Sequence, residues 1–248
     1  MRSLVSLPTG FRMYPQFLRD AGYYCSNNNK EDYNLAKPGK VWDDSSTKAH
    51  WTNRGPYQPF FAIFNHTVTH ESQVRKRPHN FVHDPTKVRV PAYHPDTPEM
   101  RRDRANYYDQ MARLDAQVAG LLRQLEEDGL AKDTIVFYYS DNGGVLPRSK
   151  RFCYDSGLHT ALIVRFPEKW SHLAPAPPGS RVSAPVGSVD FAPTVLQLAG
   201  QKIPGYMQGK AFLAKGQADG NTYAFSFRNR MDERYDMVRT LRGVRYRY

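Results

Sequence analysis

The sequence is short of cysteine and of long hydrophobic runs, and both shortages restrict what the chain can be. It has two cysteines, Cys25 and Cys153, among its 248 residues. They could pair once or both stay reduced, but they cannot build a disulfide framework or a cysteine-rich metal site. No stretch approaches the roughly 18 apolar residues of a membrane-spanning helix. We therefore expect no membrane span.

Acidic residues are scarce relative to basic ones. The chain has 24 Asp and Glu against 35 Lys and Arg, a formal net charge of +11. This balance favours an anionic partner, which could be nucleic acid, an anionic lipid surface or a small polyanionic substrate. The basic residues are spread along the chain, densest at 228–248, and no nucleic-acid-binding module is recognisable. A solvated basic surface and a grip on an acidic substrate both stay open, and a nucleic-acid-binding protein is the rival from another class.

Hydrophobic patterning predicts an α/β fold. Hydrophobic residues make up 40% of the chain and aromatic residues 13%, which excludes global disorder. Continuous apolar runs predict buried strands, and apolar positions at helical spacing predict helices. The expected strands are 60–64, 135–139, 161–166 and 223–227; the expected helices are 14–24, 99–128 and one capped by Asp190; a hairpin is expected within 238–248, turning at Arg242 and Gly243.

Polar clusters follow two of the predicted strands. Residues 66–70 follow the strand at 60–64, and residues 141–144 follow the strand at 135–139. In open α/β sheets, ligands bind outside the carboxyl ends of the strands. These two clusters are therefore stronger site candidates than polar residues elsewhere.

Asp141 and Asn142 offer a carboxylate and an amide oxygen on adjacent residues. Such hard oxygen ligands suit Ca²⁺ or Mg²⁺. The following glycines would let the backbone turn beside a ligand. Because Asn-Gly is also common in ordinary turns, the residues alone allow either a metal site or a plain turn.

Lys150 and His70 are candidate contacts for an anion. Lys150 could return a positive charge to the strand end that carries Asp141, or it could lie in a solvent-facing basic loop. His70 could face a ligand, or backbone groups could satisfy it. Residue type and spacing leave both pairs of alternatives open.

Several motifs follow one another in a fixed order along nearly the whole chain. They are Leu18-Arg19-Asp20-Ala21-Gly22-Tyr23-Tyr24; residues 28–34; Pro59-Phe60-Phe61-Ala62-Ile63-Phe64-Asn65 with Thr69-His70-Glu71-Ser72; Tyr139-Ser140-Asp141-Asn142-Gly143; Lys150 with Tyr154-Asp155-Ser156-Gly157; Ser188-Val189-Asp190-Phe191-Ala192-Pro193-Thr194; and the stretch from Arg230 to Asp236. Together these motifs resemble the sulfatase family, and in particular its heparan N-sulfoglucosamine sulfohydrolase branch with the bacterial relatives.

The resemblance implies roles for five residues. Asp141 and Asn142 would be ligands of one active-site Ca²⁺, and His70 and Lys150 would contact the substrate sulfate. Lys30 matches the lysine of the family's Lys-x-His element, where it would neutralise the sulfate and the nucleophile. The sequence departs from this element by carrying Asp32 where many relatives have a second basic residue.

The resemblance also implies a nucleophile that this chain does not carry. Sulfatases use a formylglycine, installed by a maturing enzyme on Cys or Ser in a Cys-x-Pro-x-Arg setting. Neither Cys25 nor Cys153 is followed by that Pro and Arg, and the stretch beginning at Ser6 has Gly10 in place of the Arg. We therefore expect the nucleophile and two further metal-binding aspartates upstream of Met1, and a fragment that binds Ca²⁺ poorly and does not turn over substrate.

The implied fold is alkaline-phosphatase-like, with a mixed, mainly parallel sheet flanked by helices. Residues 1–204 would form a partial catalytic domain, and 205–248 would begin a small C-terminal antiparallel subdomain. The implied activity is hydrolysis of sulfate esters or sulfamates on sulfated glycans by an exported protein: periplasmic, secreted or lysosomal. The alternatives are a phosphodiesterase or phosphonate hydrolase of the same superfamily, and a non-catalytic sulfatase-like or polyanion-binding protein.

Overall fold

A computed structural model describes residues 5–213, 221–231 and 234–248. The chain divides into two compact units, each built from two separate stretches of sequence. The first unit comprises residues 1–65 and 175–224, and the second comprises 66–174 and 225–248. The boundary that the sequence predicts near residue 205 stays a prediction.

The first unit contains a three-stranded parallel sheet. Its strands are β1 (Tyr24–Asn28), β2 (Asp44–Ser45) and β3 (Phe60–Phe64), in the order β2-β1-β3. The sheet confirms the parallel strand predicted at 60–64, but β3 is half-buried because it lies at the edge of the described sheet. The central strand β1 was not predicted, since its sequence ends in polar residues that carry no apolar run.

Two helices and the sheet enclose the core of the first unit. Helix α1 (Tyr14–Asp20) starts with Pro15 in its first turn, and Gly22 just beyond its end has a φ of +89°, which glycine adopts without strain. Helix α5 (Phe191–Leu198) contacts α1. The buried cluster consists of Leu18, Cys25, Val41, Trp42 and Leu196. Both predicted helices are therefore confirmed.

The predicted capping role of Asp190 is wrong. Its backbone is already helical because it closes the short 3₁₀ turn η3 (Ser188–Asp190), so its carboxylate does not bond the first turn of α5. Instead the carboxylate accepts hydrogen bonds from the Gly187 amide at 2.8 Å, the Lys210 amide at 2.8 Å and the Asn221 side chain at 2.7 Å. Asp190 thus connects the start of α5 to two later segments of the same unit.

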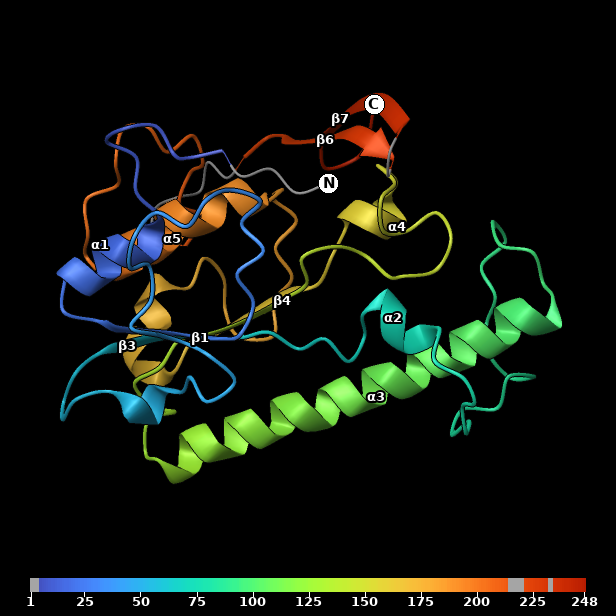
Figure 1. Ribbon diagram of the computed structural model, residues 1–248, viewed down its shortest axis with the longest axis horizontal. Coiled ribbons are helices and arrows are strands. Elements are labelled where there is room, and N and C mark those ends of the chain that lie inside the picture. The colour runs from blue at the N-terminus through green and yellow to red at the C-terminus, as the bar shows by residue number, and fades with distance from the viewer. Residues whose placement is uncertain (1–4, 214–220, 232–233) are drawn as a thin grey trace. The chain divides into compact units, whose positions relative to one another are not determined.

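The second unit contains one long helix. Helix α3 (Pro98–Glu127) starts at Thr97, whose hydroxyl accepts a hydrogen bond from the Met100 amide, and Gly129 follows its end with a φ of +71°. The helix confirms the prediction for 99–128. Short helix α2 (Glu71–Val74) packs beside it (Figure 1). No described helix is long and apolar enough to cross a bilayer.

Two of the predicted strands pair with each other in the second unit. Strand β4 (Val136–Tyr139) pairs with β5 (Leu162–Arg165), which confirms both strands, but the pairing is antiparallel. The expected buried strand is only half-buried, and Tyr139 is exposed. Between β4 and β5 lies the short helix α4 (Asp155–Leu158), and the 3₁₀ helix η2 (Glu168–Leu173) follows β5. The first unit has its own 3₁₀ helix, η1 (Trp51–Asn53).

The C-terminal stretch forms paired strands and a terminal hairpin. Strand β6 (Ala224–Met231) confirms the strand predicted at 223–227 and pairs with β7 (Arg234–Arg242). Mutual amide-to-carbonyl bonds of 2.9 Å join Leu241 to Tyr248, which confirms a hairpin within 238–248. Its turn lies at residues 243–246 and not at Arg242 and Gly243, because Arg242 pairs with Arg247 and the Gly243 amide bonds the Tyr246 carbonyl. Residues 214–220 of the predicted C-terminal subdomain lie outside the described part of the chain, as do Asp232 and Glu233 of the Arg230–Asp236 motif.

A buried carboxylate fixes an irregular segment onto α3. Asp109 is 3% exposed and accepts bonds from the His79 ring at 2.8 Å, the His83 ring at 2.6 Å and the amides of Val82 and His83. Burial alone would raise the pKa of Asp109, but these hydrogen bonds outweigh it and lower the pKa to about 2.

Replacing Asp109 by Asn should lower the free energy of unfolding near neutral pH by about 2 kcal/mol. Because the folded pKa lies below the unfolded value of about 3.9, this stabilisation is complete above pH 4 and disappears as the pH falls towards 2. Urea unfolding at several pH values measures it. The exposed Asp115→Asn on the same helix is the control, and equal losses in both variants would contradict the account.

Candidate functional site

The structure brings two of the predicted anion contacts together. The Lys150 ammonium nitrogen lies 3.3 Å from Nε2 of His70, although the residues are 80 positions apart in the sequence. His70 precedes α2, and its Nδ1 accepts a hydrogen bond from the Ser72 amide at 3.3 Å. The cap therefore fixes the orientation of the imidazole ring.

This arrangement places two donors at one point. Since Nδ1 of His70 accepts a bond, the neutral ring carries its proton on Nε2. An ammonium group also donates only, so Lys150 and the Nε2–H of His70 do not satisfy each other. No described carboxylate forms an ion pair with Lys150. An anionic acceptor such as a sulfate oxygen would satisfy both groups.

Two glycines allow the loop that carries Lys150 to fold back. The Gly143 amide bonds the Gly157 carbonyl at 2.9 Å, and the Lys150 amide bonds the Gly144 carbonyl at 2.9 Å. A Cβ on Gly143 would lie 1.9 Å from the Ser156 carbonyl oxygen, and one on Gly157 would lie 2.2 Å from that of Ser149. Any side chain at Gly143 or Gly157 would therefore push the neighbouring backbone segments of the loop apart.

Asp141 and Asn142 stand at the end of β4 with free side-chain oxygens. Asp141 is exposed, and neither side chain forms a hydrogen bond or ion pair with another described residue. Calcium takes about six to eight oxygen ligands. Among the described residues no group of three His, Cys, Asp or Glu side chains could hold a metal. The donor type fits Ca²⁺, and these two residues would supply part of its shell.

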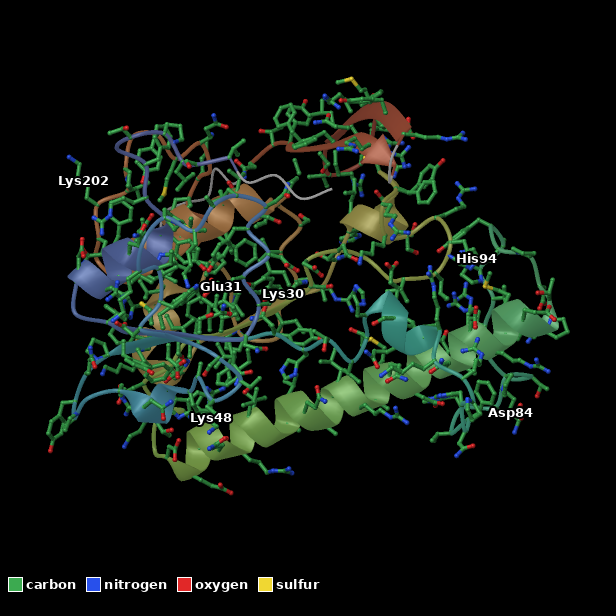
Figure 2. The ribbon with its side chains drawn as sticks, in the orientation of Figure 1. Lys30, Glu31, Lys48, Asp84, His94 and Lys202 are labelled. Atoms are coloured by element: carbon green, nitrogen blue, oxygen red, sulfur yellow. The ribbon has the colours of Figure 1, made fainter. Side chains whose placement is uncertain are left out.

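Lys30 belongs to the first unit, where it follows β1 and is exposed (Figure 2). Its ammonium lies 3.9 Å from the Asp32 carboxylate, a loose pair in which both side chains are more than 40% exposed. The backbone carbonyl of Lys30 accepts a 2.9 Å hydrogen bond from the buried side-chain amide of Asn27. The side-chain oxygen of Asn27 in turn accepts a 2.8 Å hydrogen bond from the Asn65 side chain. Asp32 therefore partly offsets the charge of Lys30.

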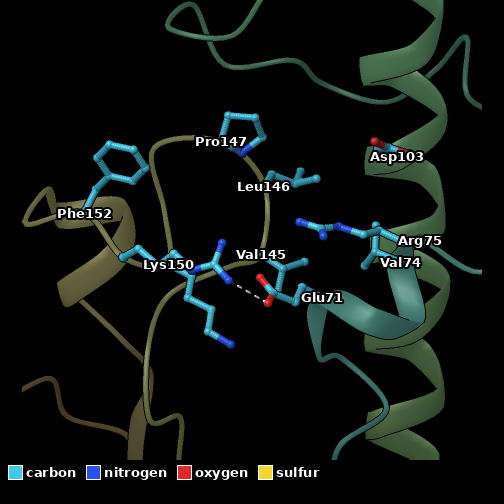
Figure 3. A pocket seen from close by; sticks show the side chains of 10 residues that line it. Glu71, Val74, Arg75, Asp103, Val145, Leu146, Pro147, Lys150 and Phe152 are labelled. Carbon is cyan, nitrogen blue, oxygen red and sulfur yellow. Dashed lines mark hydrogen bonds and ion pairs between the residues drawn. The ribbon is translucent and has the colours of Figure 1, made fainter. Parts of the chain in front are cut away.

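The second unit also contains a cavity of about 300 Å³ that sequence reasoning missed (Figure 3). It lies between the end of α2, the side of α3 and the loop from Val145 to Phe152. Lys150 is one of its lining residues. Because the lining comes from three distant parts of the sequence, no local pattern could have indicated it.

Comparison with known proteins places this geometry in a family. The family model described as sulfatase matches residues 8–201. The chain is 38% identical over 279 aligned positions to an ulvan-active sulfatase of Formosa agariphila, covering 97% of this chain and 46% of that protein. It is 29% identical to the human N-sulphoglucosamine sulphohydrolase, covering 67% of this chain and 34% of that enzyme.

A solved structure shows the same fold. A protein captured with its substrate D-glucosamine-2-N,6-O-disulfate aligns with a TM-score of 0.69 at 17% identity, covering 98% of this chain and 73% of that one. The fold is therefore the alkaline-phosphatase-like α/β fold of the sulfatases, as predicted. The chain belongs to the sulfatase family. It spans about half the length of the ulvan-active sulfatase and about a third of the human enzyme.

Gly143→Ala should destabilise the second unit by about 2 kcal/mol, because the new methyl group meets backbone that cannot move away as a flexible side chain would. Gly120→Ala is the matched control: it lies within α3 with open space around it, so the change should stabilise by about 0.5–1 kcal/mol. Thermal unfolding of the two variants tests this. Equal stability of the two would contradict the packing argument.

Proposed function

We propose that this chain supplies the sulfate-holding part of a sulfatase active site, in a protein that hydrolyses sulfate esters or sulfamates on sulfated glycans. The observation that carries the proposal is the pair of donors on Lys150 and His70, which lie 3.3 Å apart and have no described acid to satisfy them. Membership of the sulfatase family supports it.

The pair suits the charge that develops in sulfuryl transfer. Negative charge accumulates on the sulfate oxygens in the transition state, and donors already held in place stabilise it without reorganisation. The cap on His70 and the folded-back loop of Lys150 hold both donors before substrate arrives. Lys30 would add a further positive charge to the sulfate and the nucleophile.

Asp141 and Asn142 would hold part of the shell of one Ca²⁺. When bound, the ion would neutralise sulfate charge as a Lewis acid. The nucleophile would be a formylglycine outside this chain, made by a maturing enzyme from Cys or Ser. The exported setting implied by the family resemblance, whether periplasmic, secreted or lysosomal, belongs to the same proposal.

The substrate class rests on charge and on the relatives. The names of two relatives and the bound ligand of a third protein refer to ulvan, N-sulfoglucosamine and a disulfated glucosamine. The net charge of +11 suits a polyanion of this kind. A sulfated glycan is therefore the proposed substrate of the whole protein.

The proposal is tested with the protein translated from the complete reading frame that contains this chain. It should release sulfate from sulfated oligosaccharides, and Lys150→Gln should lower kcat/KM by about 100-fold because it removes one transition-state donor. Lys132→Gln, which removes an exposed charge elsewhere in the second unit, should leave the rate unchanged. Ion chromatography of free sulfate measures the effect.

Three results would contradict the proposal, each in a different way. Hydrolysis of phosphonate or phosphate diesters without sulfate release would favour the other hydrolases of the superfamily. A reading frame without a Cys or Ser in the modification motif would favour a non-catalytic binding protein. Tight DNA or RNA binding that falls steeply with salt would favour the nucleic-acid alternative.

A further inference from the structure

The cavity of the second unit has a charged rim and an apolar wall. Its wall consists of Val74, Val145, Leu146, Pro147 and Phe152, and its charged groups are Glu71, Arg75, Asp103, Lys150 and Arg151. At about 300 Å³ it is at the small end of ligand sites, with room for a single sugar unit. A sugar ring has both apolar C–H faces and polar edges, so a wall of this mixed kind suits it.

The acids of the cavity are already neutralised. The Glu71 carboxylate pairs with the Arg151 guanidinium at 3.0 Å (Figure 3). The Asp103 carboxylate pairs with the Arg77 guanidinium at 2.6 Å. These contacts leave Arg75 and Lys150 as the uncompensated charges of the cavity, and both are positive.

The Arg75 side chain is placed where it could bind a ligand in the cavity. It follows α2 directly, and its side chain points between Leu146 and Val145 into the cavity (Figure 3). Its guanidinium forms no hydrogen bond or ion pair with any described residue. A planar guanidinium binds a carboxylate or sulfate through two parallel hydrogen bonds, which gives it both strength and directional selectivity.

We propose that this cavity is a specificity subsite for a saccharide unit that carries a second negative group, a carboxylate or another sulfate, bound by Arg75. Lys150 and His70 hold the sulfate to be cleaved at the neighbouring position. The inference rests on the proposed function and adds a selection rule to it: the preferred substrate has two negative groups, one for each cation. Arg75 takes no part in the bond-breaking step.

Binding to the protein translated from the complete reading frame tests this directly, with its nucleophilic Cys or Ser replaced by Ala so that no probe is hydrolysed. The probes are N-acetyl-D-glucosamine 6-sulfate, whose single sulfate is its only charge, D-glucosamine-2-N,6-O-disulfate with two sulfates, and a 2-O-sulfated glucuronic acid with a sulfate and a carboxylate. Ligand-observed NMR titration gives each dissociation constant. At least one doubly charged probe should bind about tenfold more tightly than the singly charged one, the effect expected of one charge-assisted contact.

Arg75→Gln should abolish this tenfold preference and change the affinity for the singly charged sugar by less than about twofold. Arg75→Lys should restore part of the preference, since it keeps the charge and loses the two-pronged geometry. Arg102→Gln is the matched control, because it removes an exposed guanidinium of α3 that does not line the cavity. Unchanged thermal unfolding confirms that the variants are folded.

The outcomes separate the inference from the function on which it rests. If Lys150→Gln weakens every probe while Arg75→Gln leaves the preference intact, or no preference exists, the subsite is wrong and the sulfate-binding role stands. If no probe depends on Lys150, the proposed function fails and the subsite fails with it. Comparing the two doubly charged probes tells whether the second group is a sulfate or a carboxylate.

Discussion

The close contact of two backbone segments at Gly143 and Gly157 is the constraint on which the candidate site depends. With hydrogen at these positions, the loop after β4 can fold onto itself, and the Gly143 amide reaches the Gly157 carbonyl at 2.9 Å. That folded loop carries Lys150 to His70 at the start of α2. It also provides the wall of the cavity from Val145 to Phe152. The two glycines thus position Lys150 beside His70, although they contribute no side chain to the site.

The site is built from donors that lack acceptors. Donors buried in a protein are normally paired, but His70 and Arg75 are exposed and Lys150 is half-buried, so water can bond these groups until a ligand replaces it. Here Lys150 meets the Nε2–H of His70, and Arg75 has no described partner, whereas the nearby acids Glu71 and Asp103 are paired. This distribution of charge suits the anionic ligand that we propose. It agrees with membership of the sulfatase family without depending on it.

The sequence predicted the elements with regular apolar patterns. The 30-residue helix α3 and the strands β3, β4 and β5 follow from hydrophobic period and run length. It missed β1, because Ser26 and Asn27 are polar yet buried. The Asn27 side chain is satisfied by hydrogen bonds to the Lys30 carbonyl and the side chains of Ser45 and Asn65, and no local pattern predicts the last two. The sequence wrongly predicted that Asp190 caps α5, because local sequence cannot show that this carboxylate accepts hydrogen bonds from residues up to 31 positions away.

In the candidate site, too, some residues could be predicted from local sequence and others depend on tertiary contacts. Asp141 and Asn142 could be noticed as hard oxygen ligands from residue type alone, but Lys150 and His70 gained their weight from the resemblance, since no spacing rule connects residues 80 positions apart. Arg75 gave no signal in the sequence. Its role depends on which acids are already paired, and only the fold determines that.

The most direct measurement of the central claim is a crystal structure of the chain bound to a sulfated sugar. The account predicts sulfate oxygens within about 3 Å of both the Lys150 ammonium and Nε2 of His70, since both donate charge-assisted hydrogen bonds. A sulfate bound elsewhere, with Lys150 and His70 directed away from it, would contradict the claim that these two residues hold the reacting group.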